Sequence, residues 1–278
     1  MSRLMFQFVF TSLLYATPFA AQSAWAFDDN GHIAVAKVAD KYLTDTARQK
    51  LQQLIDQKHI YDRSICMFAD SYKHTTAGKH TRSWHYVDIP DDAADYKASR
   101  DCINKDCVVA QISEQLAILK SSNAPQAKKV MALKLLVHFV GDIHQPLHCA
   151  ERNNDVGGNE VHVRFLDRQG ITNLHSVWDG AILDENMQEL DPEEYAAEIQ
   201  TRITAQQKTD WEQITDPAAW ANEGHNLAHD VAYKDIPDHS PTPFVINEAY
   251  VTAAKPVIES QIQKAGVRLA KLLNEALQ

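Results

Sequence analysis

Residues 137–148, VHFVGDIHQPLH, place three histidines and an aspartate in a stretch that is otherwise mostly apolar. Residues 126–143 carry apolar side chains at i, i+3 and i+4, a spacing that predicts a helix. His138 and Asp142 are four residues apart and therefore share one face of this helix. The sequence thus puts proton- and metal-binding chemistry where a helix would normally bury leucines.

The spacing H-x3-D-x5-H allows three of these side chains to meet. At roughly 100° per residue, His144 lies about 240° around the helix from His138 and points away from that face. Pro146 disfavours further helix, so His148 just beyond it can turn back toward Asp142. We therefore expect the three to converge on a small volume, with His144 left out.

Helical periodicity dominates the rest of the chain as well. It predicts further helices over residues 31–43, 46–56, 108–120, 216–233 and 246–277. Thr44 is a candidate N-cap, and Pro256 should kink or divide the last helix. Residues 159–175 contain the alternating stretch VHVRF and the turn DRQG, which predict a β-hairpin. Without internal repeats or a Ser/Gly-rich linker, the chain is expected to form a mainly α, single-domain fold over residues 27–278.

Residues 1–26 predict a secretory signal peptide. Arg3 supplies a positive n-region, MFQFVFTSLLYA a short apolar core, and Ala24-Trp25-Ala26 an A-x-A cleavage site. The mature chain would begin at Phe27 and be secreted or periplasmic; an uncleaved anchor or a buried first helix is the alternative. No later stretch reaches about 18 apolar residues, so no membrane span is expected, and a monomer is the default.

The four cysteines are an even number, which fits an exported chain with disulfides. Cys102 and Cys107 enclose the short polar loop INKD and are expected to pair, which leaves Cys66 with Cys149 by elimination. No N-x-[ST] sequon occurs, and this favours a bacterial periplasm over a eukaryotic secretory route.

The formal net charge of the chain is −10. A protein that binds duplex DNA needs a basic face to release counterions, so this balance argues against that class. Bound metal cations could instead attract a polyanionic substrate.

Further imidazole and carboxylate side chains occur at close spacing elsewhere. His175 and Asp179 repeat the i, i+4 spacing in NLHSVWDG. The other members of the set are His32, Asp70, His85 and Asp88, with Lys73 three positions after Asp70. Mixed imidazole and carboxylate ligands suit zinc, and three protein ligands plus water is the catalytic pattern. No H-E-x-x-H motif is present, which argues against a common zinc protease.

In six segments, taken in order, the chain resembles the zinc-dependent single-strand-specific nucleases, the nuclease S-one/P-one family: FDDNGH, FADSYK, SWHYVDIP, HFVGDIHQPLH, DVGGNEVHVRF and NLHSVWD. The similarity runs from Phe27 into the last helix and covers nearly all of the mature chain. Members occur in fungi, plants and bacteria and are distant relatives of bacterial zinc phospholipase C. The resemblance implies the helical fold of that group and a site for three zinc ions.

The family pattern assigns nine residues of this chain to the zinc ions. The first zinc would be held by Asp70, His85 and His138; the second, bridged to it by Asp142, by His32 and the α-amino and carbonyl groups of Phe27; and the third by His148, His175 and Asp179. The family usually begins with Trp instead of Phe27. Because the ligands there are main-chain atoms, this difference should affect packing rather than the metal, and the α-amine is free only after the signal peptide is removed.

The resemblance also implies a mechanism, which we take as a hypothesis. A hydroxide bridging two zinc ions would attack phosphorus in line, and release of the 3′-oxygen would leave products with 5′-phosphates. Asp70 would orient the nucleophile, Asp142 would bridge the two ions, and Lys73, where the family often has Arg, would neutralise the phosphate as a point charge.

Tyr86 and Asp88 match the base pocket of the family, with DVGG at 155–158 as a facing wall. Stacking contributes roughly 1–3 kcal/mol per base, too little to extract a base from a duplex. The expected substrates are therefore single-stranded DNA and RNA, and 3′-nucleotides. The sequence does not rank DNA against RNA.

Two other functions remain open. A zinc phospholipase C would share the metal core, but that relative has a glutamate where Asp179 stands, and Tyr86 with Asp88 suits a base rather than a choline headgroup. A non-catalytic periplasmic zinc-binding protein would bind metal without hydrolysing any phosphodiester. His225 and His229 are also i, i+4, but they lie outside the family pattern and we expect structural roles for them.

Overall fold

A computed structural model describes residues 27–238 and 240–278, so the predicted signal peptide lies outside the described residues. The longer helices are α1 (Asp29–Lys41), α2 (Asp45–Leu54), α6 (Val108–Lys120), α7 (Gln126–Asp142), α10 (Pro192–Ile199), α11 (Ala205–Gln213), α12 (Pro217–Leu227) and α13 (Glu248–Ala276). Shorter helical segments are α3 (Arg63–Cys66), α4 (Phe68–Lys73), η1 (Lys79–His85), α5 (Ala98–Asp101), η2 (Ile103–Lys105), η3 (Pro146–Cys149), α8 (Leu174–Ser176), η4 (Val177–Ala181), α9 (Ile182–Met187), η5 (Gln200–Arg202) and η6 (Ala228–Ala232). The strands are β1 (His162–Phe165), β2 (Thr172–Asn173) and β3 (Phe244–Ile246). The fold is mainly helical with one small sheet, as predicted.

Side chains that cap the first free backbone N–H groups determine where several helices begin. Thr44 accepts a hydrogen bond from the Ala47 N–H and begins α2, as predicted. Asp191 and Thr204 begin α10 and α11 with capping boxes. The apolar periodicity did not predict these two helices. The reason is clearest for α11, which buries none of its residues and therefore has no apolar stripe.

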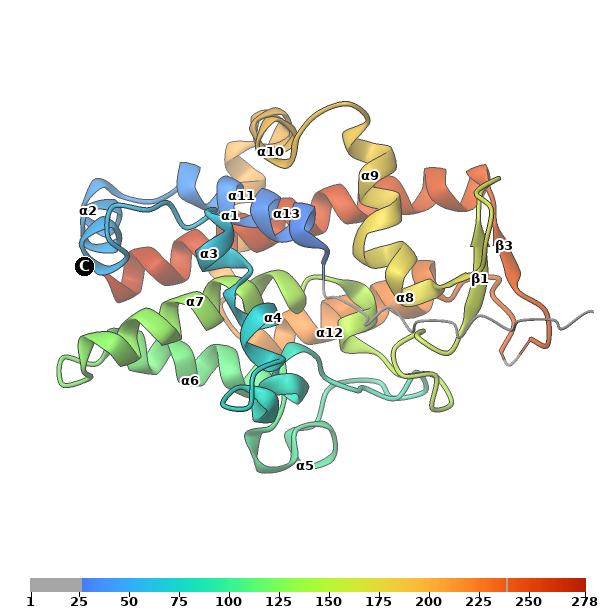
Figure 1. Cartoon of the computed structure of the whole chain (residues 1–278), viewed down its shortest axis with the longest axis horizontal. Coiled ribbons are helices and arrows are strands. Elements are labelled where there is room, and N and C mark those ends of the chain that lie inside the picture. Colours follow the sequence, from blue (N-terminus) through green and yellow to red (C-terminus); the bar gives the residue numbers. More distant parts are fainter. Residues whose placement is uncertain (1–26, 239) are drawn as a thin grey trace, which may run out of the picture.

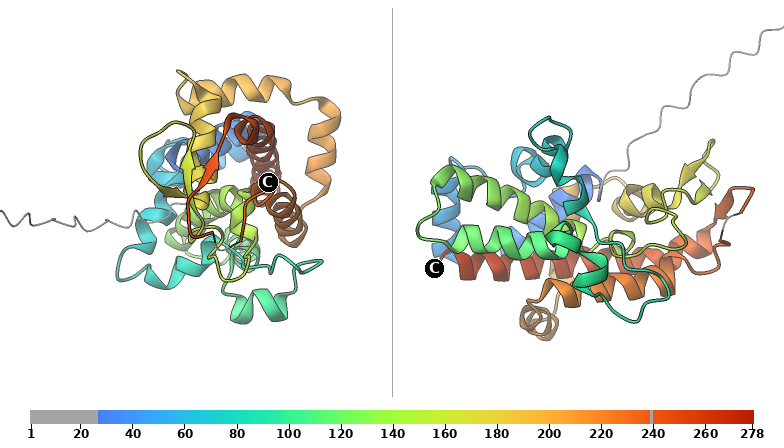
Figure 2. Two further views of the ribbon diagram at one scale, coloured as in Figure 1. Left: turned by 90° about the vertical axis from the view of Figure 1, so that its right-hand side faces the viewer. Right: turned by 90° about the horizontal axis from the view of Figure 1, so that it is seen from below.

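Helix α13 runs along most of the length of the molecule and packs against several others (Figures 1 and 2). It contacts α1 and α7, and α7 lies alongside α6. Helices α13 and α1 approach each other closely at Gly266, where a Cβ atom would lie 2.4 Å from Val38 Cγ1. This close approach requires glycine at that position. The arrangement places the carboxyl end of α7, with Asp142, in the buried centre of the molecule.

Pro256 does not divide the last helix, contrary to one of the two predicted outcomes. Helix α13 continues through it from Glu248 to Ala276. A proline removes one backbone N–H donor from the helix. Both Pro256 and Thr252, the residue four positions before it, are exposed, so solvent can satisfy the carbonyl that loses its partner.

The predicted β-hairpin is present at one end of the molecule (Figure 1). Strand β1 pairs with β2 in antiparallel orientation, with His162 opposite Asn173. Strand β3 was not predicted. It pairs with β1 in parallel, with Val163 opposite Phe244, and gives the order β2-β1-β3. A three-residue strand is too short to produce a recognisable alternation of polar and apolar residues.

Cys102 and Cys107 form the expected disulfide. The predicted pairing of Cys66 with Cys149 is wrong, because both are free buried thiols. Each Sγ donates instead to a main-chain carbonyl near it in sequence, Cys66 to Tyr61 and Cys149 to Ile143. Elimination failed because an even number of cysteines does not require all of them to be bonded.

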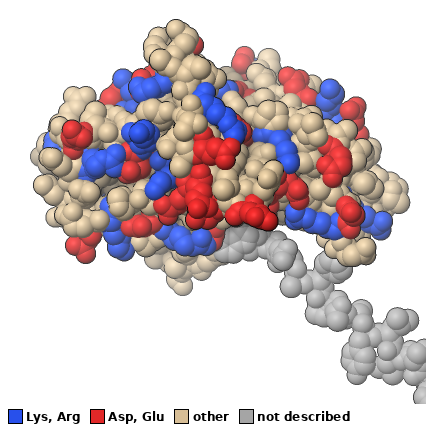
Figure 3. Space-filling model, turned by 90° about the horizontal axis from the view of Figure 1, so that it is seen from above, with Lys and Arg blue, Asp and Glu red and all other residues tan. Residues whose placement is uncertain are grey.

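The surface carries both signs of charge. On the face seen in Figure 3, acidic and basic side chains of the described residues are mixed rather than gathered into one broad basic area. This mixture on one face is consistent with the net charge of −10. Within residues 27–238 and 240–278, no helix is long and apolar enough to cross a membrane.

We expect Gly266→Ala to lower the free energy of unfolding by about 1–3 kcal/mol, because the added methyl group must push α1 away from α13. Helix propensity alone would raise it by up to about 1 kcal/mol, so the sign of the change separates the two effects. Urea denaturation followed by circular dichroism measures it. Thr252→Ala, at an exposed position of the same helix, is the matched control. A Gly266→Ala protein as stable as this control would contradict the close crossing.

Candidate metal centre

Three groups of buried His and Asp side chains lie close together in the interior. They come from α1, α4, η1, α7, η3, α8 and η4, segments far apart in the sequence. The groups are His32, His138 and Asp142; Asp70, His85 and His138; and His148, His175 and Asp179. Within each group the potential ligand atoms lie within 4.8 Å of one another. The structure therefore brings together all the side chains that the resemblance assigned to zinc.

Asp142 lies between two of these groups. Its Oδ1 is 3.3 Å from His32 Nε2, and its Oδ2 is 2.9 Å from His85 Nδ1 and 3.4 Å from His138 Nε2. Its two oxygens thus face different histidines, as a carboxylate that bridges two ions must do. Gly141 makes this possible, because a Cβ atom there would lie 2.7 Å from His32 Nδ1.

Asp70 adds a second carboxylate beside His138 and His85. Its Oδ1 lies 3.4 Å from His138 Nε2 and 3.8 Å from His85 Nδ1. The same oxygen accepts a hydrogen bond from Lys73 Nζ at 2.5 Å, whereas Oδ2 is buried without a hydrogen-bond partner. The i, i+3 spacing on α4 therefore places an ammonium group directly beside the group of ligands.

The third group is built on irregular helix. His175 lies in α8, and Asp179 lies in the π-helical turn η4 that follows. Nε2 of His175 is 3.5 Å from Asp179 Oδ2, and Nε2 of His148 is 3.8 Å from Asp179 Oδ1. Single π turns are frequent at functional sites because they redirect one side chain within a helix.

Gln145 positions Asp179 and was missed by the sequence analysis. Its Nε2 donates to Asp179 Oδ1 at 2.6 Å, and its Oε1 accepts from the Leu147 N–H at 2.6 Å. The side chain is fully buried. It therefore links the turn that carries His148 to the carboxylate of the same group. Its position next to Pro146 in HQPLH was the only signal that could have pointed to it.

Main-chain carbonyl groups fix the orientation of three of the histidines. The Nδ1–carbonyl pairs are His138 with Cys66 at 2.7 Å, His148 with His85 at 2.9 Å, and His175 with Gly157 at 2.7 Å. A carbonyl oxygen can only accept, so each Nδ1 carries the proton and each Nε2 presents its lone pair. Histidines that bind metals are commonly oriented in this way.

Burial determines the protonation of these side chains. It lowers the pKa of His148 to about 3 and the pKa values of His85 and His175 to about 4, so these rings are neutral near pH 7. Burial also raises the pKa of Asp179 well above its ordinary value. Burial would do the same to Asp142, but the neighbouring His138 and His85 hold its pKa well below the ordinary value.

These residues fit buried metal cations. Several nitrogen and oxygen atoms have no hydrogen-bond partner although they are fully buried: both ring nitrogens of His32 and His85, Nε2 of His138 and His148, both oxygens of Asp142, and Oδ2 of Asp70 and Asp179. A buried polar atom without a partner costs roughly 1–3 kcal/mol. Cations bound among these atoms would remove that cost, and the mixture of imidazole and carboxylate ligands suits zinc.

Phe27 lies at the start of the described chain and beside the centre. Its side chain is fully buried, with its ring 6.5 Å from the His32 ring, centroid to centroid. The N–H of Asp28 donates to the Asp179 carbonyl at 2.9 Å. These contacts place the main chain of Phe27 near both ends of the centre.

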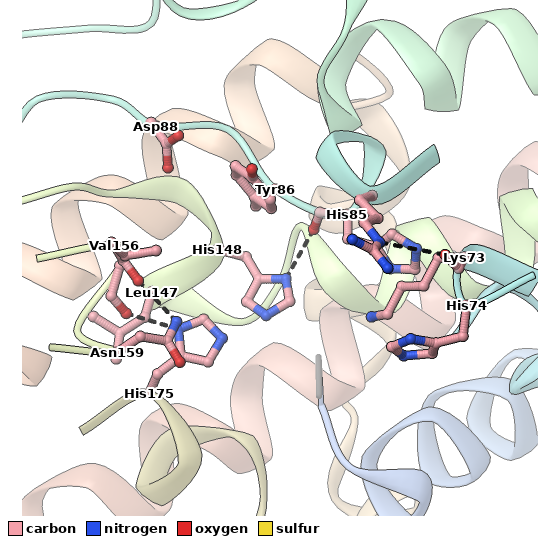
Figure 4. Close-up of a pocket in the computed structure, with 12 residues that line it drawn as sticks. Lys73, His74, His85, Tyr86, Asp88, Leu147, His148, Val156, Asn159 and His175 are labelled. Carbon is pink, nitrogen blue, oxygen red and sulfur yellow. Dashed lines mark hydrogen bonds between the residues drawn. The ribbon is translucent and has the colours of Figure 1, made fainter. Parts of the chain in front are cut away.

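A pocket of about 250 Å³ opens beside these groups (Figure 4). His85, His148 and His175 line it together with Lys73, Tyr86 and Asp88. Tyr86 is 40% exposed and Val156 is 55% exposed, so both present apolar surface to a ligand. Val156 has a φ of +55°, which is strained for a β-branched residue and typical of functional loops.

The sequence analysis missed three other residues of the pocket, His74, Arg82 and Asn159. Asn159 lies inside the segment DVGGNEVHVRF quoted for the resemblance, but none of these three side chains was assigned a role from the sequence, so only the folded chain places them in the pocket.

The remaining histidines of interest lie outside the three groups, as expected. His144 is buried, with its Nδ1 bonded to the Val140 carbonyl and its Nε2 to Arg268. His225 bonds to the Ala93 carbonyl, and His229 is exposed and pairs with Asp91. None of the three belongs to a group of potential metal ligands among the described residues.

Comparison with known proteins identifies the class: this chain is a nuclease, a hydrolase that acts on nucleic acids. It belongs to the S1/P1 nuclease family, whose sequence model matches residues 27–278. That match covers the whole of the expected mature chain and confirms the resemblance inferred from the six segments.

The chain is similar to curated proteins from plants and fungi. It is 31% identical to endonuclease 4 of Arabidopsis thaliana, over 90% of this chain and 89% of that protein. It is 29% identical to nuclease S1 of Aspergillus oryzae, over 93% of this chain and 94% of that protein. It is 31% identical to nuclease P1 of Penicillium citrinum, over 88% of this chain and 96% of that protein.

We expect His175→Ala to lower the metal content by about one ion per chain, because it removes a neutral imidazole from the third group only. Metal analysis by inductively coupled plasma mass spectrometry after dialysis measures the content. His229→Ala, which changes an exposed histidine outside the groups, should leave the metal content as it is in the wild type. A His175→Ala protein with unchanged zinc would show that the third group does not hold a metal.

Proposed function

We propose that the chain is a zinc-dependent phosphodiesterase that hydrolyses single-stranded DNA and RNA to products with 5′-phosphates, and that it also acts as a 3′-nucleotidase. The observation that carries this proposal is the convergence of three buried His/Asp groups beside a pocket lined by Lys73 and Tyr86. The names of two relatives, nuclease S1 and nuclease P1, support the nuclease part. Export by a signal peptide that ends at Ala26, and a monomeric state, belong to the same proposal.

Three zinc ions would be held as the family pattern implies. One would bind Asp70, His85 and His138; a second would bind His32 and the α-amino and carbonyl groups of Phe27, with Asp142 between the two; and the third would bind His148, His175 and Asp179. Bound zinc supplies positive charge for the phosphate and can lower the pKa of a water molecule from about 16 to about 7.

Asp70 and Lys73 are the side chains best placed to act on the substrate. Asp70 Oδ2 has no hydrogen-bond partner, so it can orient a water molecule as a hydrogen-bond acceptor. Lys73 Nζ, held on Asp70 Oδ1, lines the pocket and can neutralise a phosphate oxygen. Asp142 contacts both His32 and His85, and it would support the same reaction by keeping these two ligands in place relative to each other.

Preference for single strands follows from the chemistry of the pocket. Tyr86 offers an exposed ring for stacking, and Asp88 offers a carboxylate for the hydrogen-bond donors of a base (Figure 4). Stacking contributes roughly 1–3 kcal/mol per base, and extracting a paired base costs a few kcal/mol. The pocket therefore accepts a base that is already unpaired and cannot profitably open a duplex.

The proposal is tested by incubating the protein that begins at Phe27 with a single-stranded oligonucleotide and identifying the products by mass spectrometry. We expect short fragments and mononucleotides with 5′-phosphates, and no cleavage after chelation of the metal. The same sequence as a perfect duplex should be cleaved far more slowly.

An intact oligonucleotide in the presence of bound zinc would contradict the nuclease function and favour the phospholipase C or zinc-binding alternatives. A chain with extra residues before Phe27 provides a further comparison. Its residue 27 nitrogen is an amide and cannot serve as an amine ligand, so both zinc content and activity should fall.

The contribution of Asp88 should depend on pH. Burial, together with the nearby carboxylates of Glu151, Asp101 and Asp155, raises the pKa of Asp88 to about 6. The ionised form accepts hydrogen bonds from a base, so the KM for a guanine 3′-nucleotide should rise about tenfold as pH falls from about 7 to about 5. Asp88→Asn should have a high KM at pH 7 and lose this part of the pH dependence. An unchanged pH profile of KM in Asp88→Asn would remove Asp88 from base recognition.

A further inference from the structure

One segment beside the pocket is basic in a chain that is acidic as a whole. Residues 71–87 contain Lys73, Lys79 and Arg82 and no Asp or Glu, whereas the net charge of the chain is −10. Lys73 is mostly buried against Asp70, but Lys79 and Arg82 are exposed. Both exposed side chains are accessible to an anion in solution.

The helical form of this segment aligns its cations with the centre. Segment η1 is a 3₁₀ helix over Lys79–His85. In a 3₁₀ helix, side chains three positions apart lie on the same face, separated by about 6 Å along the axis. Lys79, Arg82 and His85 therefore form one row, with His85 at the metal end. Successive phosphates of an extended single strand have a similar spacing.

Of the two exposed cations in this row, Arg82 is the one that lines the pocket. It lines the pocket together with Lys73 and His74, and its Nε donates to the Lys73 carbonyl at 3.5 Å. Among the arginines that the structure describes, only Arg82 and Arg164 form no ion pair with a carboxylate. An arginine held beside a substrate pocket without an acidic partner is available to bind a phosphate.

The opposite end of the pocket has the opposite charge. Asp88 lies there, with Glu151, Asp101 and Asp155 close enough to influence it. Figure 4 shows Asp88 and Tyr86 on one side of His148, and Lys73 with His74 on the other. The pocket therefore has an acidic end that suits the donors of a base and a basic end that suits phosphates.

We propose that Arg82 binds the phosphate on the 3′ side of the cleaved linkage, so that the enzyme holds two successive phosphates of a strand. This proposal rests on the proposed nuclease function and deepens it. The nucleoside in the Tyr86 pocket carries the cleaved phosphate on its 3′-oxygen, and the strand beyond that phosphate leads away from the base, toward the basic end. Arg82 thereby gives polymers an advantage over 3′-mononucleotides, which have no second phosphate.

The test uses two trinucleotides that differ only in the second linkage, which is a phosphodiester in one and an uncharged methylphosphonate in the other. Cleavage of the first linkage is measured as kcat/KM for the zinc-loaded wild type and for Arg82→Gln. For the wild type we expect the charged second linkage to raise kcat/KM about fivefold, the upper range for an exposed charge pair. For Arg82→Gln the two substrates should become equivalent, which is the coupling that a double-mutant cycle isolates.

Two further variants sharpen the result. Arg164→Gln, which removes the other unpaired exposed arginine from strand β1, should keep the full preference for the charged linkage. Arg82→Lys should keep part of it, because an ammonium group retains the charge but not the fork of donors. Zinc content and circular dichroism of each variant verify that the centre and the fold are intact.

Two outcomes would overturn the proposal. In one, the wild type cleaves both trinucleotides equally well; in the other, Arg82→Gln retains the preference of the wild type. A wild type that cleaves neither trinucleotide, although zinc is bound, would instead contradict the proposed function itself, so the two failures are distinguishable.

Discussion

The structure depends on how the negative charge of its buried carboxylates is compensated by nearby positive charge. Asp70, Asp142 and Asp179 belong to three neighbouring groups of ligands, and each of these carboxylates is at most 4% exposed. One ammonium group, that of Lys73, contacts this set through Asp70. Burying ionised carboxylates without cations is strongly unfavourable. The fold around these carboxylates is therefore suited to enclose metal ions, and metal binding should contribute part of the stability of the folded chain.

The same requirement explains the irregular local structure at the centre. The seven segments that supply ligands include two 3₁₀ helices, η1 and η3, a π-helical turn and α-helices of only a few residues. The long regular helices have a different role. Helices α13, α1, α6 and α7 pack along the molecule and support the short segments (Figures 1 and 2). Close packing at Gly266 and Gly141 brings the regular frame near enough for His32 to reach Asp142.

The sequence was sufficient to predict those ligands of the centre that follow a regular helical spacing. His138 with Asp142 and His175 with Asp179 could be inferred from i, i+4 spacing alone. Asp70, His85 and His32 were candidates by residue type, but only the family pattern assigned them to particular ions. Gln145 and Arg82 could not be inferred, because their roles arise from tertiary contacts and carry no periodic signal. The wrong pairing of Cys66 with Cys149 has the same origin, since counting residues says nothing about which thiols meet. Strand β3 and helix α11 were missed because one is too short and the other too polar to show a pattern.

His85 takes part in the centre in two separate ways. Its imidazole faces Asp142 in one group, while its main-chain carbonyl accepts the hydrogen bond that orients His148 in another. A displacement of η1 that moves the ring must also move the carbonyl. The two halves of the centre are thus joined mechanically through a single residue, and disorder that begins at one metal would be transmitted to its neighbour even if no ligand were shared.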